Sequence, residues 1–302
     1  MTANPPDTTR GEADALSALR REIDEIDAAM HDLLMRRAEV TRRIGTLKDE
    51  NSTYMRPGRE AVVLRRLIAR HRGALPAALL VRIWREIFAA VTALQGPLAV
   101  AVHAPEGSFG YRNLARDHFG WRTPITAYRS AAQVLEAVSD GRATVGVLPL
   151  PAGDDKGAWW RTLARDGEAV PRILARLPFV EVEPPRGDSP EALVVGHAPV
   201  EPTGDDHGFL VLETRQVISR SYLREMLGRA GFEVVDIQVS EEDGGQALNL
   251  VEVAGFVADD DPRIAWLRAQ DDDAPSHVWV VGGYAVPLSL EEPEPATRTG
   301  GP

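Results

Sequence analysis

Five cations gather in one short stretch of the chain. The stretch LLMRRAEVTRRIGTLK, residues 33–48, carries Arg36, Arg37, Arg42, Arg43 and Lys48. Such a cluster either faces solvent or holds an anion, and guanidinium groups suit carboxylates because their fork matches two oxygens at once. Arg37 and Lys48 are eleven residues apart, close to three helical turns. A helix would therefore project both from nearly the same face, as a site for an anion requires.

The positive charge of this stretch contrasts with the negative charge of the whole chain. The 302 residues have a formal net charge of −11, yet residues 15–95 carry +5, which leaves −16 on the remainder. A basic module on an acidic body indicates a small anionic ligand or a protein partner, whereas the acidic remainder disfavours nucleic acid. The 34 basic residues include only two lysines, Lys48 and Lys156. Lys48 is thus a candidate for a role that arginine does not fill.

The cationic stretch belongs to a long predicted helix. Apolar residues recur every three or four positions from about Ala13 to Lys48 without a proline, a length of roughly 50 Å at about 1.5 Å per residue. Two shorter helices are expected over about 58–72 and 77–95, the second opened by Pro76. These cannot bury the whole stripe of the first helix. We therefore expect an intertwined homodimer, with a simple coiled coil as the alternative.

The pattern changes to α/β after residue 96. Buried strands are expected at LAVAVHA and TVGVLPL, with a helix between them that is capped at Ser130 and ended at Gly141. A ferredoxin-like order follows from near His207. Its predicted elements are strand 208–214, helix 218–231, strand 233–239, strand 247–257, helix 262–270 and strand 277–282.

These patterns predict a multidomain chain. The expected parts are a disordered tail over 1–12, a helical domain over 13–96, an α/β domain over 97–206, a ferredoxin-like α+β domain over 207–288 and a disordered tail over 289–302.

The helical domain resembles the all-helical (AroQ) class of chorismate mutase. The resemblance is carried by LSALRREIDEID, LLMRRAEVTRRIGTLK, RPGREAVVLRRL and IWREIFAAVTALQ, in that order and spacing. It implies a dimer in which each site borrows an arginine from the partner protomer, here Arg20. The matching site residues within one protomer are Arg37, Lys48, Arg59, Glu60 and Gln95. The other arginines noted in the module are assigned to the surface: Arg21, Arg36, Arg42, Arg43 and Arg65.

The residue types fit the reaction that the resemblance implies. Chorismate is a dicarboxylate, and its pericyclic rearrangement to prephenate needs no proton transfer, no covalent intermediate and no cofactor. Catalysis then consists of holding a compact conformer and stabilising charge at the breaking ether bond. Arg20, Arg37 and Arg59 would bind the substrate. Lys48 and Gln95 would donate to the ether oxygen, and Glu60, paired with Arg59, would accept from the ring hydroxyl.

The middle of the chain resembles prephenate dehydratase with its reactive groups missing. HAPEGSFGYRNLARDHFG, GRATVGVLPLPAGDDKG and SPEALVVGHAPVEPTGDD resemble three dehydratase segments. Where that family has Thr-Arg-Phe, this chain has Pro190-Glu191-Ala192, and where it has Glu-Asn-Ser, this chain has Pro151-Ala152-Gly153. Glu191 would place an anion where a dicarboxylate substrate would sit. The domain is therefore expected to be degenerate and without dehydratase activity.

The C-terminal domain resembles an ACT domain, the family that binds amino acids at a dimer interface. HVWVVGGYAVPL fits its last strand, but RQVISRSYL and VSEEDGG depart from its effector motifs. An amino-acid effector, a partner enzyme and a purely structural role all stay open. The order of the three domains resembles the bifunctional chorismate mutase–prephenate dehydratase of phenylalanine biosynthesis.

Composition narrows the remaining choices. The chain has no cysteine, its histidines show no metal-ligand spacing, and neither a signal peptide nor an apolar stretch that could span a membrane is recognisable. A cytoplasmic chorismate mutase of aromatic amino acid biosynthesis is the first hypothesis. A regulatory or scaffold protein with a vestigial mutase, and a bifunctional mutase–dehydratase, are the alternatives.

Overall fold

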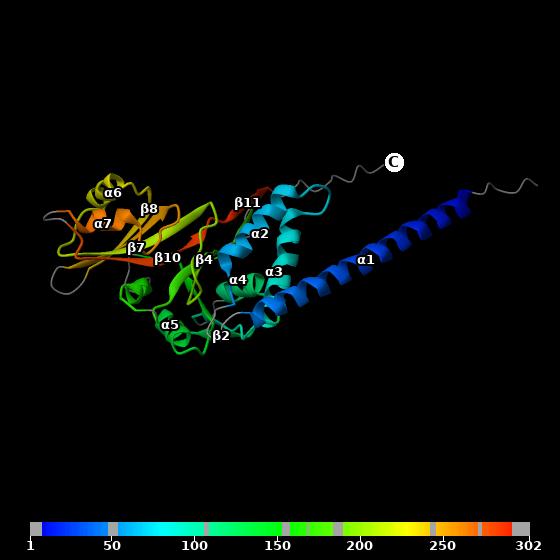
Figure 1. Cartoon of the computed structure of the whole chain (residues 1–302), viewed down its shortest axis with the longest axis horizontal. Helices are drawn as coiled ribbons and strands as arrows, with labels where there is room; N and C mark the ends of the chain where they lie inside the picture. The colour runs from blue at the N-terminus through cyan, green and yellow to red at the C-terminus, as the bar shows by residue number, and fades with distance from the viewer. Residues whose placement is uncertain are drawn as a thin grey trace, which may run out of the picture. The chain divides into compact units, whose positions relative to one another are not determined.

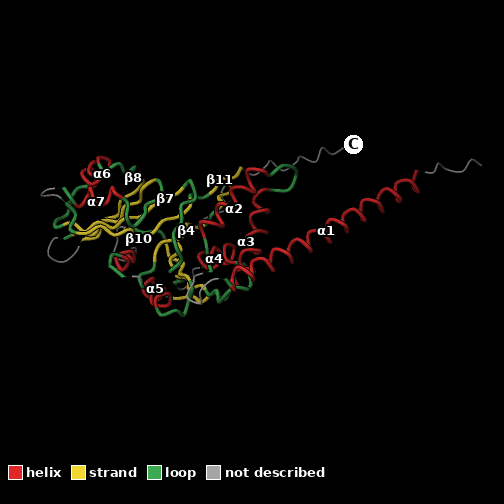
Figure 2. The backbone as a smooth tube through the Cα atoms, in the orientation of Figure 1, coloured by secondary structure: helices red, strands yellow, loops and turns green. Residues whose placement is uncertain are grey.

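The computed structural model describes residues 8–47, 54–105, 109–152, 158–167, 169–183, 190–241, 246–270 and 274–291. It divides into two compact units, residues 1–52 and 53–302. Lys48 lies outside the described residues. Figures 1 and 2 show the elements of each unit.

The first unit is the helix α1, Thr8–Thr46. Its periodicity predicted a helix, and the helix begins five residues earlier than expected. The apolar stripe is exposed along its length, with 57% of Leu19, 51% of Ile26 and 64% of Leu33 accessible to solvent. A single helix cannot bury its own apolar stripe. Since most helical stability in proteins comes from packing of such a stripe, α1 is expected to pack against another surface.

The second unit begins with a helical hairpin. Helix α2 spans Pro57–Arg70 and α3 spans Ala77–Ala93. The pair is held by a small apolar cluster of Ala61 and Leu64 from α2 with Val81 and Phe88 from α3. Phe179, just before the strand β5 (Val180–Glu183), joins the same cluster, so the hairpin packs on the segment that leads into β5.

Arg65 corrects the sequence assignment. It was expected on the surface, but its side chain is only 18% exposed. Its guanidinium donates to Thr203 Oγ1 at 2.7 Å and to the backbone oxygens of Asp205 and Val286 at 2.7 and 2.8 Å. The sequence pattern places Arg65 on the polar face of its helix, but in the structure this face contacts the loops that contain Thr203, Asp205 and Val286. Arg65 therefore connects α2 to these loops. Arg21, Arg36, Arg42 and Arg43 are exposed as predicted.

One nine-stranded sheet organises the rest of the second unit. Its order is β2-β1-β3-β6-β4-β10-β7-β9-β8, with β1, β2 and β3 parallel and β4 parallel to β10. The first five strands in this order are β2 Ile125–Tyr128, β1 Val100–His103, β3 Val145–Pro149, β6 Ala192–Gly196 and β4 Arg172–Leu177. The others are β10 His277–Ala285, β7 Asp206–Thr214, β9 Ala247–Ala254 and β8 Val234–Glu241. A second, two-stranded sheet pairs β5 Val180–Glu183 with β11 Leu288–Glu291.

Short helices cover the sheet. They are α4 Gly110–Phe119, α5 Ala131–Ser139, the 3₁₀ helix Ala158–Leu163, α6 Arg220–Arg229 and α7 Pro262–Arg268. The predicted cap of α5 is present, because Ser130 Oγ accepts from Gln133 N at 3.3 Å. Gly141 follows that helix with φ of +71°, a conformation that favours glycine.

The predicted βαββαβ order of the C-terminal part is confirmed by β7, α6, β8, β9, α7 and β10. Alternate residues of β7 separate two cores. Leu210 and Leu212 pack with residues of α6 and α7, whereas Phe209 and Val211 pack with Trp160. The 3₁₀ helix thus contributes to the core on the face that α6 and α7 leave uncovered.

The sheet is continuous across residue 206, where the sequence pattern suggested a domain boundary. Its two halves meet at the pair Gly282 and Ile173, between β10 and β4. Gly282 has φ of +121°, and a Cβ there would clash with the Ile173 backbone. This close approach requires glycine, which no strand periodicity could have predicted.

Candidate functional site

The structure places Glu60 in the first turn of α2. Pro57 opens that helix, where its fixed φ suits the first turn and its missing N–H costs nothing. A carboxylate in the first turn is favoured by the positive end of the helix dipole. Glu60 is partly buried, with 18% of its side chain exposed.

Arg85 of α3 binds Glu60. Its Nη1 lies 2.8 Å from Glu60 Oε2, and its own side chain is only 6% exposed. The guanidinium also stacks over the ring of Phe179 at 5.1 Å. Burial lowers the pKa of Arg85, and the charge of Glu60 opposes that shift. Glu60 was expected to pair with Arg59; the structure shows an ion pair of Glu60 with Arg85, and Arg59 is exposed.

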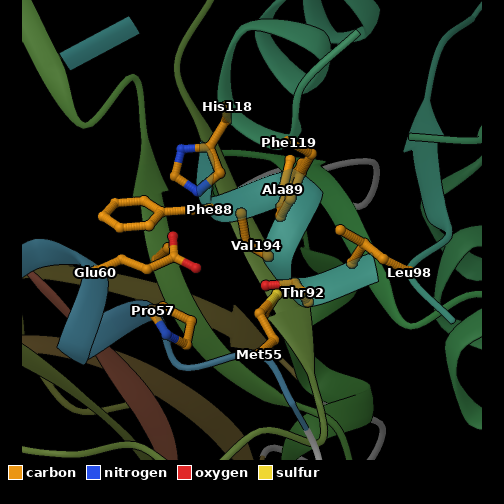
Figure 3. Close-up of a pocket in the computed structure, with 11 residues that line it drawn as sticks. Met55, Pro57, Glu60, Phe88, Ala89, Thr92, Leu98, His118, Phe119 and Val194 are labelled. Carbon is orange, nitrogen blue, oxygen red and sulfur yellow. The ribbon is translucent and has the colours of Figure 1, made fainter. Parts of the chain in front are cut away.

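His118 lies beside this pair. Burial, together with the charge of Arg85, lowers its pKa well below the ordinary value, so the imidazole is neutral at pH 7. Figure 3 shows Glu60, Phe88 and His118 gathered at one end of a small pocket, with Leu98 at the other. The cavity measures about 20 Å³, room for about one water molecule and too little for an organic acid.

The remaining predicted site residues are spread over both units. Arg20 is exposed and Arg37 half-buried on α1, and the backbone oxygen of Arg37 accepts from Thr41 Oγ1 at 3.0 Å. Gln95 is half-buried just after α3, and its Nε2 donates to Val91 O at 3.3 Å. The structure thus brings Glu60 together with Arg85, a residue that was not predicted. It does not test the assembly of the six predicted residues.

The sequence did contain a signal for Arg85. It lies between Val81 and Phe88, four and three residues away, on the apolar stripe that α3 buries. A cation in the middle of a buried stripe requires a carboxylate partner, because burying it alone is costly. Its spacing therefore predicts an inward ion pair, and Glu60 in the neighbouring helix is the partner found.

Two of the segments that resemble dehydratase motifs lie close together in the structure. Glu191, at the start of β6, binds Arg176 of β4 with Oε1 2.7 Å from Nη2 and 3.2 Å from Nε. Pro151 follows β3 and lines the same cavity as Arg176. The predicted anion at Glu191 is therefore neutralised by an arginine of the adjacent strand.

Within the described residues no helix is long and apolar enough to cross a membrane. Nor do the described parts of the chain bring three or more His, Asp or Glu side chains together as metal ligands.

Comparison with known proteins gives the helical segment its class. The family model of chorismate mutase type II matches residues 19–96. This match confirms the resemblance of the N-terminal helices to a chorismate mutase domain, and it contains all six predicted site residues.

The bifunctional chorismate mutase/prephenate dehydratases are relatives of the chain. The one from Stutzerimonas stutzeri is 34% identical over 145 residues, which are 46% of this chain and 40% of the relative. The one from Neisseria gonorrhoeae is 34% identical over 144 residues, 48% of this chain and 39% of the relative. The chain thus spans about two fifths of the length of the curated relatives it matches.

Solved prephenate dehydratases resemble the chain more distantly. The enzyme from Streptococcus mutans has a TM-score of 0.45 at 15% identity, over 64% of this chain and all of that chain. The enzyme from Arthrobacter aurescens, in complex with L-Phe, has a TM-score of 0.47 at 12% identity, over 62% of this chain and 90% of that one.

Proposed function

We propose that the chain is a chorismate mutase that works as a homodimer. The observation that carries the proposal is the family match over residues 19–96, which includes Arg20, Arg37, Lys48, Arg59, Glu60 and Gln95. In the rearrangement the ether C–O bond breaks and a C–C bond forms, so prephenate keeps every atom of chorismate. No proton or redox partner is consumed.

Each proposed residue acts by charge or hydrogen bonding. Arg37, Arg59 and Arg20 of a second copy bind the two carboxylates. Lys48 and Gln95 stabilise the negative charge that develops on the ether oxygen. Glu60, which binds Arg85, accepts a bond from the ring hydroxyl.

The second copy is proposed from the surface of α1. Apolar residues along the helix are half exposed or more, among them Leu19, Ile23, Met30 and Leu33. A contiguous apolar stripe of this length marks an interaction surface. A second α1 fits it, because the same stripe is then buried on both copies, as a two-fold interface requires.

Dehydratase activity is proposed to be absent. Among the described residues that line its cavity, Arg176 is the only cation, and Glu191 already binds that guanidinium. The β7–β10 part is proposed to be ACT-like and structural. An amino-acid effector or a partner enzyme that binds this part would add regulation to that structural role.

The experiment mixes the purified chain with chorismate and follows chorismate, prephenate and phenylpyruvate together. Loss of chorismate with accumulation of prephenate supports a mutase without dehydratase activity. Phenylpyruvate formed at an enzymatic rate would support the bifunctional alternative, and unchanged chorismate would support a regulatory protein with a vestigial mutase.

A further inference from the structure

A second cavity lies outside the helical segment, where the two halves of the large sheet meet. It measures about 260 Å³ and is much larger than the space beside Glu60. Its apolar wall is formed by Leu150, Pro151, Leu193, Phe209 and Leu250. A concave apolar wall with a few converging polar groups is typical of small-molecule sites.

A connected row of polar side chains forms the other wall. Arg176 Nη1 donates to Tyr284 Oη at 3.0 Å. The Tyr284 hydroxyl donates in turn to Glu252 Oε1, and the same oxygen lies 2.6 Å from His207 Nδ1. Burial, with the nearby Glu252 carboxylate, raises the pKa of Tyr284, so its hydroxyl remains protonated as a donor. The row is therefore fixed by its own hydrogen bonds.

Glu252 uses only one of its two carboxylate oxygens in this row. Both described hydrogen bonds of Glu252 fall on Oε1, and within the described residues Oε2 accepts none. The Glu252 side chain is only 12% exposed. A buried carboxylate with an uncommitted oxygen at a cavity wall is an acceptor for a donor from outside.

A second carboxylate stands directly opposite. A shift in register between β8 and β9 pairs Asp236 with Glu252, so both carboxylates lie on the same face of the sheet. Like charges directly across two strands repel each other. Asp236 Oδ2 accepts from Gln238 Nε2 at 2.7 Å, and no cation binds Asp236 among the described residues.

The charge balance selects the ligand. Arg176 is the cation that lines the cavity, and Glu191 neutralises it at 2.7 Å. The carboxylates of Asp236 and Glu252 then make the cavity wall negative, and His207 Nδ1 contacts Glu252 Oε1. A bound anion would meet two carboxylates without an available guanidinium, whereas a cation would relieve their repulsion.

We propose that this cavity binds a small organic cation, a primary ammonium carried on an aromatic or aliphatic body. The ammonium would donate to Glu252 Oε2 and to Asp236, and the body would pack on Phe209, Leu193 and Leu250. This site is independent of the proposed mutase chemistry, since none of its residues lies in 19–96.

The test uses the full chain and two probes of equal shape and different charge. Calorimetric titration at pH 7 compares 2-phenylethylammonium with neutral 2-phenylethanol. The ammonium is expected to bind saturably and the alcohol at least tenfold more weakly, since a hydrogen bond between two charged groups is stronger than one from a neutral hydroxyl. Equal binding of the two probes, or no saturable binding of the ammonium at millimolar concentration, overturns the proposal.

Variants locate the binding. Glu252→Gln and Asp236→Asn are each expected to weaken binding of the ammonium at least fivefold. Glu225→Gln, an exposed carboxylate on α6, serves as the matched control and should bind as the parent does. Asp236 is itself exposed, so its variant stays informative even if Glu252→Gln fails to fold. Unchanged affinity in Asp236→Asn would contradict the proposed site.

L-Phenylalanine provides a further arm of the same titration. Its carboxylate would face Glu191 and Glu252, so it should bind more weakly than 2-phenylethylammonium. Tighter binding of phenylalanine would show that the site recognises an anion and would overturn the assigned charge. None of these titrations depends on mutase activity.

Discussion

Arg85 Nη1 lies 2.8 Å from Glu60 Oε2, and the two side chains are 6% and 18% exposed. This ion pair joins α2 to α3 and borders the packing surface between the hairpin and the large sheet, where Phe179 and His118 lie. It involves a residue predicted to contact substrate and a residue that sequence reasoning missed. The same carboxylate can therefore serve stability, chemistry or both, and experiments can separate these roles.

Replacing Arg85 with leucine is expected to lower the free energy of unfolding by about 3–5 kcal/mol, because the partly buried Glu60 carboxylate would lose the guanidinium that binds it. Urea denaturation measures the loss. Arg82→Leu, an exposed arginine of the same helix, is the matched control and should change stability little. The double variant Glu60→Gln/Arg85→Leu should recover part of the loss, and simple additivity of the two changes would contradict the pair.

Replacing Glu60 with glutamine tests its proposed role in catalysis. Turnover of chorismate per folded enzyme is expected to fall, since the ring hydroxyl loses a charged acceptor worth about 1.5–3 kcal/mol. Steady-state kinetics, with the melting temperature recorded in parallel, separates the two roles. A lower melting temperature with unchanged kcat/KM would assign Glu60 to the Arg85 ion pair alone.

The apolar stripe of α1 predicts a dimer that one charge can disrupt. Ile26 is 51% exposed in the middle of that stripe, and Ile26→Asp would bury a carboxylate in the interface. Light scattering should show the parent chain as a dimer and the variant as a monomer. Ala28→Asp, off the apolar stripe of the same helix, should leave the dimer intact. A monomeric parent chain would contradict the homodimer.

His118 predicts a pH dependence of stability. Its pKa is lowered well below the ordinary value by burial and by Arg85, so the folded state binds fewer protons than the unfolded state as pH falls below about 6.5. Its contribution is fully present above that pH and is lost as pH falls toward the lowered pKa, at up to about 1.4 kcal/mol per pH unit. In denaturation at pH 7 and 5.5, His118→Gln should lose less stability between the two than the parent. An equal loss would contradict the assignment.

The elements that follow from local patterns could be predicted from the sequence. The helix α1, the hairpin α2–α3 and the βαββαβ order all follow periodicities of 3.6 or 2, and Ser130 is a side-chain cap within four residues of its partner. The resemblance to chorismate mutase rested on the order and spacing of four helical segments, and the family match over residues 19–96 confirms it.

Contacts between distant segments could not be predicted in the same way. Arg65 bonds to Asp205 and Val286 across more than a hundred residues, and β4 meets β10 at Ile173 and Gly282. Such pairs are selected by packing of the whole sheet, which leaves no periodic trace in either segment. The strands β2, β4, β5 and β11 were missed: β2, β5 and β11 have only four residues each, and β4 lies between the segments that the family resemblance supplied.

The most direct test of the central claim is the rate of chorismate loss with the parent chain and with Lys48→Ala. The account predicts that the parent converts chorismate to prephenate and that the variant, folded and dimeric, is slower on the order of 10²–10³-fold. Arg43→Ala, an exposed cation of α1, should keep the parental rate. Equal turnover by the parent and Lys48→Ala, or no turnover by either, would contradict the proposed mutase site.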